Sequence, residues 1–370
     1  MESEEDSILE LILFEQQELA TIPRLPRSFY HTIPRSQEWY LLVVPLLPAN
    51  QFRFFFRMVP DQFMHFRRLF ESKVSQDMLA SRFPMEQQLH MFLYYVGNNP
   101  YSAEMADRFA FASPLDVVYD IAELVNKYLY RVLVQWPTEN EKIVIKEDFE
   151  SFTGFRNIIG AVDGTHVVIG GIGKYRAGYT TRKCMYAINV TIVCDFRKKI
   201  LFAAVGSPGA YHDNRVYEYT TLFTDPDRHF ANNDVILGDS AYKGSCNMVV
   251  PYIRPITEAN VTFNYLHARG RVKVENTIGL VKGKFKIIGT TMRQKKLHNV
   301  IVLVKSTFSV HNFIIKYNQS NNIEDIALAE EDAENTNLQD VETLAQHRPL
   351  NVRVPLNAHN RRELMKNTNI

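Results

Sequence analysis

The sequence predicts an α/β protein in which a sheet-containing domain follows an all-α N-terminal region. Up to about residue 150, apolar side chains recur every three or four positions, which is the period of helices. Beyond residue 155, shorter apolar runs alternate with period two and are separated by turn residues, as in strands. The length of 370 residues favours about two domains.

The helical domain is expected over residues 51–150. Pro60 marks the start of one helix, and Pro84 lies in the first turn of a second that Gly97 can close. Their apolar stripes are Phe63, Phe66, Leu69 and Phe70 in the first and Leu89, Phe92, Leu93 and Val96 in the second. A short helix capped by Ser102 and a longer one from Pro114 to about Leu133 follow, separated by a four-residue turn.

The sheet-containing domain is expected over residues 151–317, because Pro137 and the charged segment 139–148 mark a boundary near residue 150. Three strands, a helix, a short strand and a later helix follow one another. They are expected at 158–169, 185–194, 200–205, 211–223, 235–237 and 271–288, with a turn at 195–199. This order matches an RNase H-like α/β domain.

The two ends of the chain are expected to lack a core. Residues 1–50 are rich in Pro and predict an extended arm, whereas residues 318–370 are acidic and polar and predict disorder. The acidic start argues against a secretory signal, and no apolar run approaches the ~20 residues that span a bilayer. Three Cys without paired spacing imply neither disulfides nor zinc, which favours a reducing compartment.

The charges are distributed unevenly along the chain. Residues 163–296 contain 20 Lys and Arg against 10 Asp and Glu, although the net charge of the chain is only +1. Residues 324–342 contain 8 acidic residues and no Lys or Arg. A basic middle segment predicts a polyanionic partner such as DNA.

Three carboxylates stand where an ionised group is costly. Asp163 interrupts an apolar strand, and Asp239 ends the buried run that starts at Val235. Each also has a simpler interpretation: a turn at Asp163-Gly164, and a helix cap at Asp239-Ser240. Glu275 lies one residue, or ~100° of rotation, from the apolar stripe of the last predicted helix.

Arg271, Lys282 and Lys286 share the side of Glu275, so we expect them to line the approach to a site and to contact DNA phosphates. The alternative for Glu275 is a solvated i,i+4 pair with Arg271. Carboxylates from separate elements suit hard divalent cations, and two such ions ~3.5–4 Å apart can drive in-line attack on phosphorus. Asp163, Asp239 and Glu275 are therefore the candidate catalytic and metal-binding residues.

The sequence resembles the PIF/Harbinger transposases and their domesticated nuclease relatives over about residues 155–288. Five blocks in the family's order carry the resemblance: Gly160 to Val167; Arg182 to Asp195; Pro208-Gly209-Ala210-Tyr211-His212-Asp213; Leu237-Gly238-Asp239-Ser240-Ala241-Tyr242; and Arg271 to Lys284. Ala210 and Ala241 depart from the Ser and Gly that are usual in the family, but every carboxylate is present.

The resemblance implies an RNase H-like fold and DNA strand cleavage by a D-D-E triad of Asp163, Asp239 and Glu275. It also implies a two-ion site for Mg²⁺ or Mn²⁺. Secondary site candidates are Asp195, His212 and Asp213, although a hairpin position for Asp195 and a helix N-cap for Asp213 are simpler. His166 and His212 are expected to form loop or core hydrogen bonds.

The resemblance also suggests a helix-turn-helix-like element over residues 102–133. Its second helix carries Asp116, Asp120 and Glu123 before the first cation, Lys127, and would repel DNA. We therefore expect a structural bundle, with sequence recognition by a separate Myb-like partner of the kind that family members use. No membrane is expected, and the presence of a homo-oligomer stays open.

Two functions are compatible with these features. The first is a metal-dependent DNA endonuclease of the Harbinger type, and the alternative is a domesticated DNA- or chromatin-associated interaction protein without catalysis. Intact acids at all three positions favour the enzyme. An unrelated two-metal phosphoesterase is disfavoured because the five blocks would need independent explanations. A DNA substrate implies residence in the nucleus, with the cytoplasm as a second location.

Overall fold

The computed structural model describes residues 38–323 except 82, 171–175 and 232. Most of the expected N-terminal arm and most of the expected polar tail therefore lie outside the described residues. The described end of the arm is not extended, because two short helical turns, η1 (Trp39–Val43) and η2 (Val44–Leu46), precede the first longer helix.

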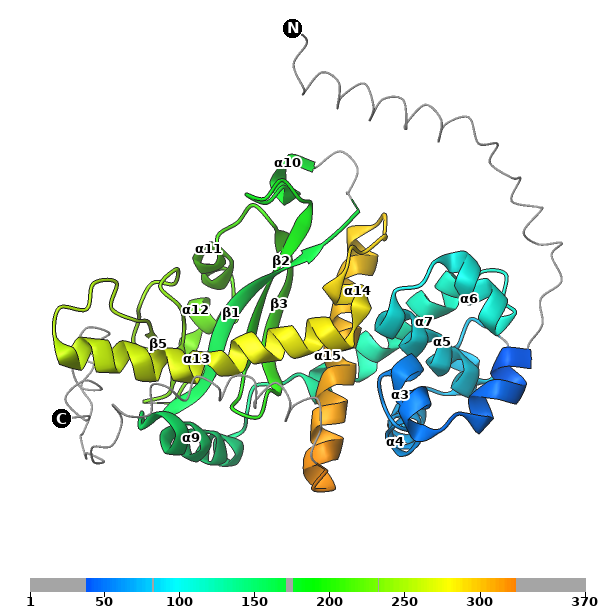
Figure 1. The fold of residues 1–370 in the computed structure, drawn as a ribbon, viewed down its shortest axis with the longest axis horizontal. Coiled ribbons are helices and arrows are strands. Elements are labelled where there is room, and N and C mark those ends of the chain that lie inside the picture. Colours follow the sequence, from blue (N-terminus) through cyan, green and yellow to red (C-terminus); the bar gives the residue numbers. More distant parts are fainter. Residues whose placement is uncertain (1–37, 82, 171–175, 232, 324–370) are drawn as a thin grey trace, which may run out of the picture.

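The helical part forms one side of the molecule (Figure 1). Its elements are α3 (Ala49–Phe56), α4 (Pro60–Glu71), η3 (Gln76–Met78), α5 (Met85–Asn98), α6 (Ser102–Phe109), α7 (Pro114–Tyr128) and α8 (Tyr130–Leu133). The helix starts expected at Pro60 and Pro114 are confirmed.

Three details of these helices differ from the predictions. Gly97 does not end α5; Asn99 does, by adopting a left-handed conformation with φ of 48°. Ser102 is the first helical residue of α6 and not its cap. The expected long helix breaks at Leu129, so that it becomes α7 and α8.

A five-stranded mixed sheet forms the other side of the molecule (Figure 1). Its strands are β1 (Ile158–Val168), β2 (Ala187–Cys194), β3 (Ile200–Pro208), β4 (Val235–Leu237) and β5 (Met248–Val249), in the order β3-β2-β1-β4-β5. The first three strands pair antiparallel, and β4 and β5 continue the sheet in parallel with β1. This mixed α/β arrangement fits the expected RNase H-like order, to which it adds the unpredicted β5.

The helices of the sheet domain depart further from expectation. The charged segment expected to mark a boundary lies within helix α9 (Glu139–Thr153), which packs against β1 and α13 (Glu258–Lys284). Helix α13 begins 13 residues before its predicted start at Arg271 and is followed by α14 (Lys286–Gly289). The helix expected at 211–223 is divided into α11 (Asp213–Glu218) and α12 (Thr221–Thr224), with α10 (Arg176–Tyr179) and η5 (Pro226–Arg228) nearby.

Helix α15 (Leu297–Ser320), which the sequence analysis did not predict, connects the two sides of the molecule (Figure 1). It packs against α4, α7 and α8 of the helical part and against β3 of the sheet. It is apolar and long enough to cross a membrane, but 78% of its most apolar window is buried inside the protein. That burial identifies α15 as a core helix.

The largest hydrophobic cluster contains residues from both the helical part and the sheet. It joins Phe56 and Phe92 of the helical part to Val190 of the sheet, and Phe308 of α15 lies among them. Two smaller clusters cover the two faces of the sheet, one under α9 and α13 and one under α11 and α12. The position of the domain boundary stays a prediction.

Candidate active site

Two adjacent parallel strands carry the two candidate aspartates. In the register of β1 and β4, Ala161 lies opposite Leu237. Asp163 follows Ala161 by two residues and still lies within β1. Asp239 follows Leu237 by two residues and lies just beyond the end of β4. The side chain of Asp239 accepts a hydrogen bond from the amide of Ala241 at 2.9 Å, which holds the carboxylate at the start of a turn. Sequence order alone does not reveal this proximity.

Helix α13 brings the third candidate, Glu275, to the same place. The guanidinium of Arg271 lies 3.3 Å from Oδ2 of Asp163 and 3.2 Å from Oε1 of Glu275. Glu275 and Arg271 therefore form the i,i+4 pair that was the simpler interpretation of Glu275. Arg271 also contacts Asp163 of β1, so the pair is part of a group of three residues. The side chain of Glu275 is 52% exposed, whereas those of Asp163 and Arg271 are 20% and 15% exposed. Thus the acids line a site that opens to solvent.

The pKa of Asp163 is raised, mainly by burial of its carboxyl group. Burial lifts the pKa from 3.8 against the lowering effect of Arg271 and of the amide of Gly164, while the charges of Asp239 and Glu275 act in the same direction as burial, and the net value is about 6. A carboxyl group whose pKa is perturbed by burial and by specific charged neighbours is a candidate functional group.

The donor set fits hard divalent cations in its chemistry, because Asp and Glu offer only oxygen ligands. Within the described ranges, no three His, Cys, Asp or Glu side chains are close enough together to hold one ion. The guanidinium of Arg271 contacts two of the three carboxylates. Its Nε is also buried without a hydrogen-bond partner, so the arrangement leaves one donor unsatisfied.

Tyr242 is a residue of this site that the sequence analysis did not select. It is 3% exposed, and its hydroxyl has no hydrogen-bond partner among the described residues. Burial raises the pKa of Tyr242, and the charges of Asp213, Asp163 and Asp239 raise it further. The only sequence signal was its position three residues after Asp239 in a motif block that already matched the family.

Asp213 lies on the other side of β1, against Gly164. A Cβ atom at Gly164 would be 2.1 Å from Oδ1 of Asp213, so only glycine leaves room for that carboxylate. The side chain of Asn189, which is buried on β2, donates a hydrogen bond of 2.8 Å to the same oxygen. Asp213 also occupies the first turn of α11. Asp213 is therefore held against β1 at the residue next to Asp163, on the face of the sheet that α11 covers.

The two histidines of the motif blocks lie at the rim. His212 is exposed, and Nη2 of Arg182 lies 3.1 Å from its Nε2. His166 lies 3.1 Å from the carbonyl oxygen of Gly209 through its Nε2, which agrees with the loop hydrogen bond expected for it. These contacts do not involve Asp163, Asp239 or Glu275.

Asp195 lies away from the three acids. It follows Cys194, which pairs with Ala161, whereas Asp163 pairs with Ile192. Its Oδ1 accepts a hydrogen bond of 2.8 Å from the amide of Lys199, which closes the β2–β3 hairpin. Burial raises the pKa of Asp195 to about 6. The geometry therefore agrees with the simpler interpretation of this residue as a hairpin aspartate.

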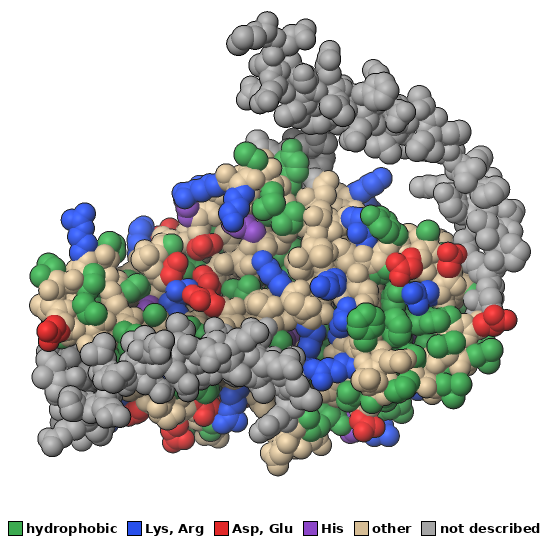
Figure 2. All heavy atoms as spheres, in the orientation of Figure 1, with side chains coloured by type: hydrophobic (Ala, Val, Ile, Leu, Met, Phe, Trp, Pro, Cys, Tyr) green, Lys and Arg blue, Asp and Glu red, His purple; other side chains and the backbone are tan. Residues whose placement is uncertain are grey.

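The three cations expected along the approach differ in position. Arg271 lies among the acids rather than beside them. Lys282 donates a hydrogen bond of 2.9 Å to the carbonyl oxygen of His166, and burial lowers its pKa. Lys286 is exposed on α14, at the end of α13 that meets the helical part. Figure 2 shows acidic side chains gathered on the face that carries α13, with Lys and Arg between them and the helical part.

The part of the chain that contains these residues is similar to known proteins. Residues 162–312 match the family described as "DDE superfamily endonuclease". The chain is 24% identical over 234 residues to "Putative nuclease HARBI1" of Rattus norvegicus, covering 62% of this chain and 67% of that protein. The human protein of the same name is 24% identical over 156 residues, covering 42% of this chain and 45% of that protein.

A plant protein is also similar. "Protein ALP1-like" of Arabidopsis thaliana is 21% identical over 198 residues, covering 49% of this chain and 48% of that protein. No solved structure matches the chain significantly. The family match begins one residue before Asp163 and ends in α15, so it includes all three candidate acids. Residues 162–312 are therefore similar to DDE superfamily endonuclease domains, and the chain is similar to the proteins named "Putative nuclease HARBI1", in agreement with the resemblance of its motif blocks to the Harbinger group.

Proposed function

We propose that this protein is a metal-dependent DNA endonuclease that hydrolyses phosphodiester bonds, with Asp163, Asp239 and Glu275 as its catalytic triad. One observation supports this most directly: Arg271 contacts both Asp163 and Glu275, while the charge of Asp239 raises the pKa of Asp163. Residues separated by more than 100 positions thus form one cluster of negative charge. A hydrolytic site of this class uses carboxylates from separate elements as metal ligands, and these three residues supply such ligands.

In this proposal the three carboxylates would hold a divalent cation, Mg²⁺ or Mn²⁺. Such an ion, when bound, supplies Lewis acidity and an activated water for attack on phosphorus. The chain's own residues orient the site. Arg271 holds Asp163 and Glu275 in place, and the Ala241 amide fixes the carboxylate of Asp239. Arg271 is a guanidinium beside these acids and would also be a bidentate donor for a phosphate oxygen.

A cleavage assay on supercoiled DNA tests the triad. With Mg²⁺ or Mn²⁺, we expect the wild type to nick the DNA and Glu275→Gln and Asp239→Asn to lose more than about 100-fold in rate, since even outer-shell changes at metal sites cost about 10–100-fold. Glu258→Gln, an exposed position on the same helix, is the matched control and should cleave normally.

The same samples distinguish the alternative function. If the wild type and Glu275→Gln are equally inert, or nick equally, the triad is not a nuclease site. A protein that binds DNA without cleaving it would then be the better description. Titration calorimetry provides a second measurement, because Asp163→Asn should abolish Mn²⁺ binding.

Location and partners follow from the substrate. Because DNA is the proposed substrate, we propose that the protein acts in the nucleus. Helix α7 is acidic at Asp116, Asp120 and Glu123 and buries its apolar face against α5 and α15. Those features support a structural role and a separate Myb-like partner for sequence recognition. A pull-down of labelled target DNA with and without such a partner tests this assignment.

A further inference from the structure

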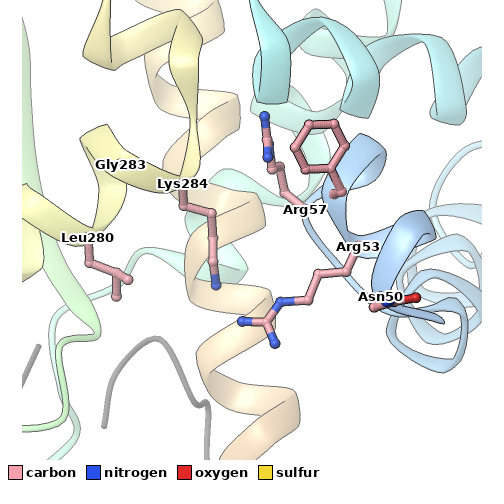
Figure 3. Close-up of a pocket in the computed structure, with 7 residues that line it drawn as sticks. Asn50, Arg53, Arg57, Leu280, Gly283 and Lys284 are labelled. Atoms are coloured by element: carbon pink, nitrogen blue, oxygen red, sulfur yellow. The ribbon is translucent and has the colours of Figure 1, made fainter. Parts of the chain in front are cut away.

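A basic pocket lies between the helical part and the end of α13 (Figure 3). It has a volume of about 410 Å³ and is lined by Asn50, Arg53, Phe54, Arg57, Leu280, Gly283 and Lys284. Arg53 and Lys284 extend toward each other from α3 and α13 (Figure 3). Three of these side chains are cationic, and none of the described residues that line the pocket is acidic.

The third cation, Arg57, is held in a fixed orientation. Its Nε and Nη2 donate to the carbonyl oxygen of Gly97 at 3.1 and 2.8 Å, and Nη2 also donates to Oδ1 of Asn98 at 2.6 Å. Its backbone adopts φ of 64°, which turns the chain at the end of α3. Burial lowers the pKa of Arg57, so this cation is costly to enclose without a compensating anion.

The pocket is connected to the acidic cluster by one face of α13. Glu275, Gly279 and Gly283 are four residues apart and all are exposed. A Cβ atom at either glycine would meet nothing within 4 Å, so packing inside this protein does not require glycine there. Each nonetheless costs up to ~1 kcal/mol relative to Ala in a helix. Glycine leaves this helix surface open to close approach by another molecule.

We propose that the pocket binds a backbone phosphate of the duplex DNA that is cleaved, and that the strand between this phosphate and the scissile bond runs along the glycine face of α13. Charge complementarity between three cations and a phosphodiester carries this assignment. Eight residues of helix place Gly283 about 12 Å from Glu275 along the axis. That separation corresponds to about three to four base pairs at 3.4 Å each.

This inference rests on the proposed function for the identity of the ligand, but its test does not use cleavage. Fluorescence anisotropy with a labelled duplex, in EDTA and across a salt series, measures binding alone. We expect Arg53→Gln and Lys284→Gln each to weaken binding about five-fold near 0.15 M salt and to reduce the slope of log K against log salt by about 1, whatever the DNA sequence.

Two exposed cations that do not line the pocket serve as matched controls. Arg68→Gln and Lys73→Gln, at the end of α4, should retain the affinity and the salt slope of the wild type. If the pocket variants bind the duplex like these controls, the pocket is not a phosphate site. Labelled polyglutamate tests an acidic protein as the alternative occupant. If it binds the wild type more tightly than the duplex does and loses this affinity in Arg53→Gln and Lys284→Gln, the proposal for DNA is overturned; weaker binding than the duplex supports it.

The glycine face has a signature that a purely structural role would not produce. Gly279→Leu fills open space in a helix, so the melting temperature should stay level or rise by about 1–3 °C. Duplex binding should nevertheless fall by at least the amount seen for Lys284→Gln. A variant that is equally stable and binds DNA normally would show that no backbone passes over this face.

Failure of this inference and failure of the proposed function are distinguishable. Glu275→Gln should bind the duplex in EDTA without the loss shown by the pocket variants, even though it does not cleave. A triad without nuclease activity would leave the anisotropy results unchanged and would mean that the pocket serves binding only. Normal binding by the pocket variants would leave the triad assignment intact.

Discussion

His90 shows what burial does to one titratable residue of this chain. It lies on α5 with 2% of its surface exposed, and its ring stacks on that of Phe63 at a centroid distance of 3.9 Å. The rings of Phe52 and Phe56 also lie close to it. Burial lowers the pKa of His90 from 6.5 to about 3, because the imidazolium would lose its hydration in this aromatic environment.

The stability of the protein should therefore depend on pH through His90. The unfolded chain binds a proton below about pH 6.5, whereas the folded chain does not until about pH 3. Stability is thus fully present above pH 6.5 and falls on acidification by up to about 1.4 kcal/mol per pH unit. Urea unfolding of the wild type and His90→Phe at several pH values measures this. Equal pH dependence in both proteins would contradict the assignment.

At the scale of elements, α15 completes the sheet at its edge strand. Asn312 is 1% exposed and donates to the carbonyl oxygens of Ile200 and Leu133 at 2.7 and 2.8 Å. Its Oδ1 accepts a hydrogen bond of 2.9 Å from the amide of Ile200. The side chain of Asn312 thus pairs with both backbone hydrogen-bonding groups of Ile200 on the edge strand β3 and connects this strand to α8.

Replacement of Asn312 should be severe. In Asn312→Leu, three buried backbone groups lose their partner, and each costs about 1–3 kcal/mol, so we expect a loss of about 3 kcal/mol or more. Gln319→Leu, at an exposed position of the same helix, should change stability by less than about 0.5 kcal/mol. Chemical denaturation measures both variants. A small effect at Asn312 would show that water replaces the amide.

At the scale of the whole molecule, the helical part and the sheet share one core. Helix α7 contributes Val118 and Ile121 to the largest hydrophobic cluster, and Val190 of the sheet and Phe308 of α15 belong to it as well. We therefore expect the two sides to fold and unfold together. Removal of either exposes apolar surface of the other.

Deletion of residues 102–133 should therefore unfold or aggregate the protein, not merely weaken its affinity for DNA. Size-exclusion chromatography and circular dichroism of the deleted protein check this. A soluble, active deletion variant would mean that the helices are a detachable module, as expected of a DNA-reading element. The full-length protein should also unfold in one calorimetric transition that coincides with loss of the helical signal.

The sequence by itself predicted the α/β class and the succession of β1 to β4 along the chain, and it selected the three acids, whose role stays a prediction. Alternation of apolar residues reports strands locally, and the motif blocks place Asp163, Asp239 and Glu275 in the family's order. The start of α4 at Pro60 was also predicted, because a capping signal is local. Features that depend only on neighbours within a few residues along the chain could therefore be predicted from the sequence.

Only the tertiary structure placed Arg271 between two acids, Tyr242 beside them and α15 in the core. Each depends on contacts between residues that are distant in the sequence, so no local period or spacing encodes it. The packing of α13 against β1 brings Arg271 to Asp163, a contact that the sequence analysis did not predict, whereas a contact of Arg271 with DNA phosphates stays a prediction. The pocket also depends on tertiary contacts, because Arg53 and Lys284 line it together only when the helical part packs against the end of α13.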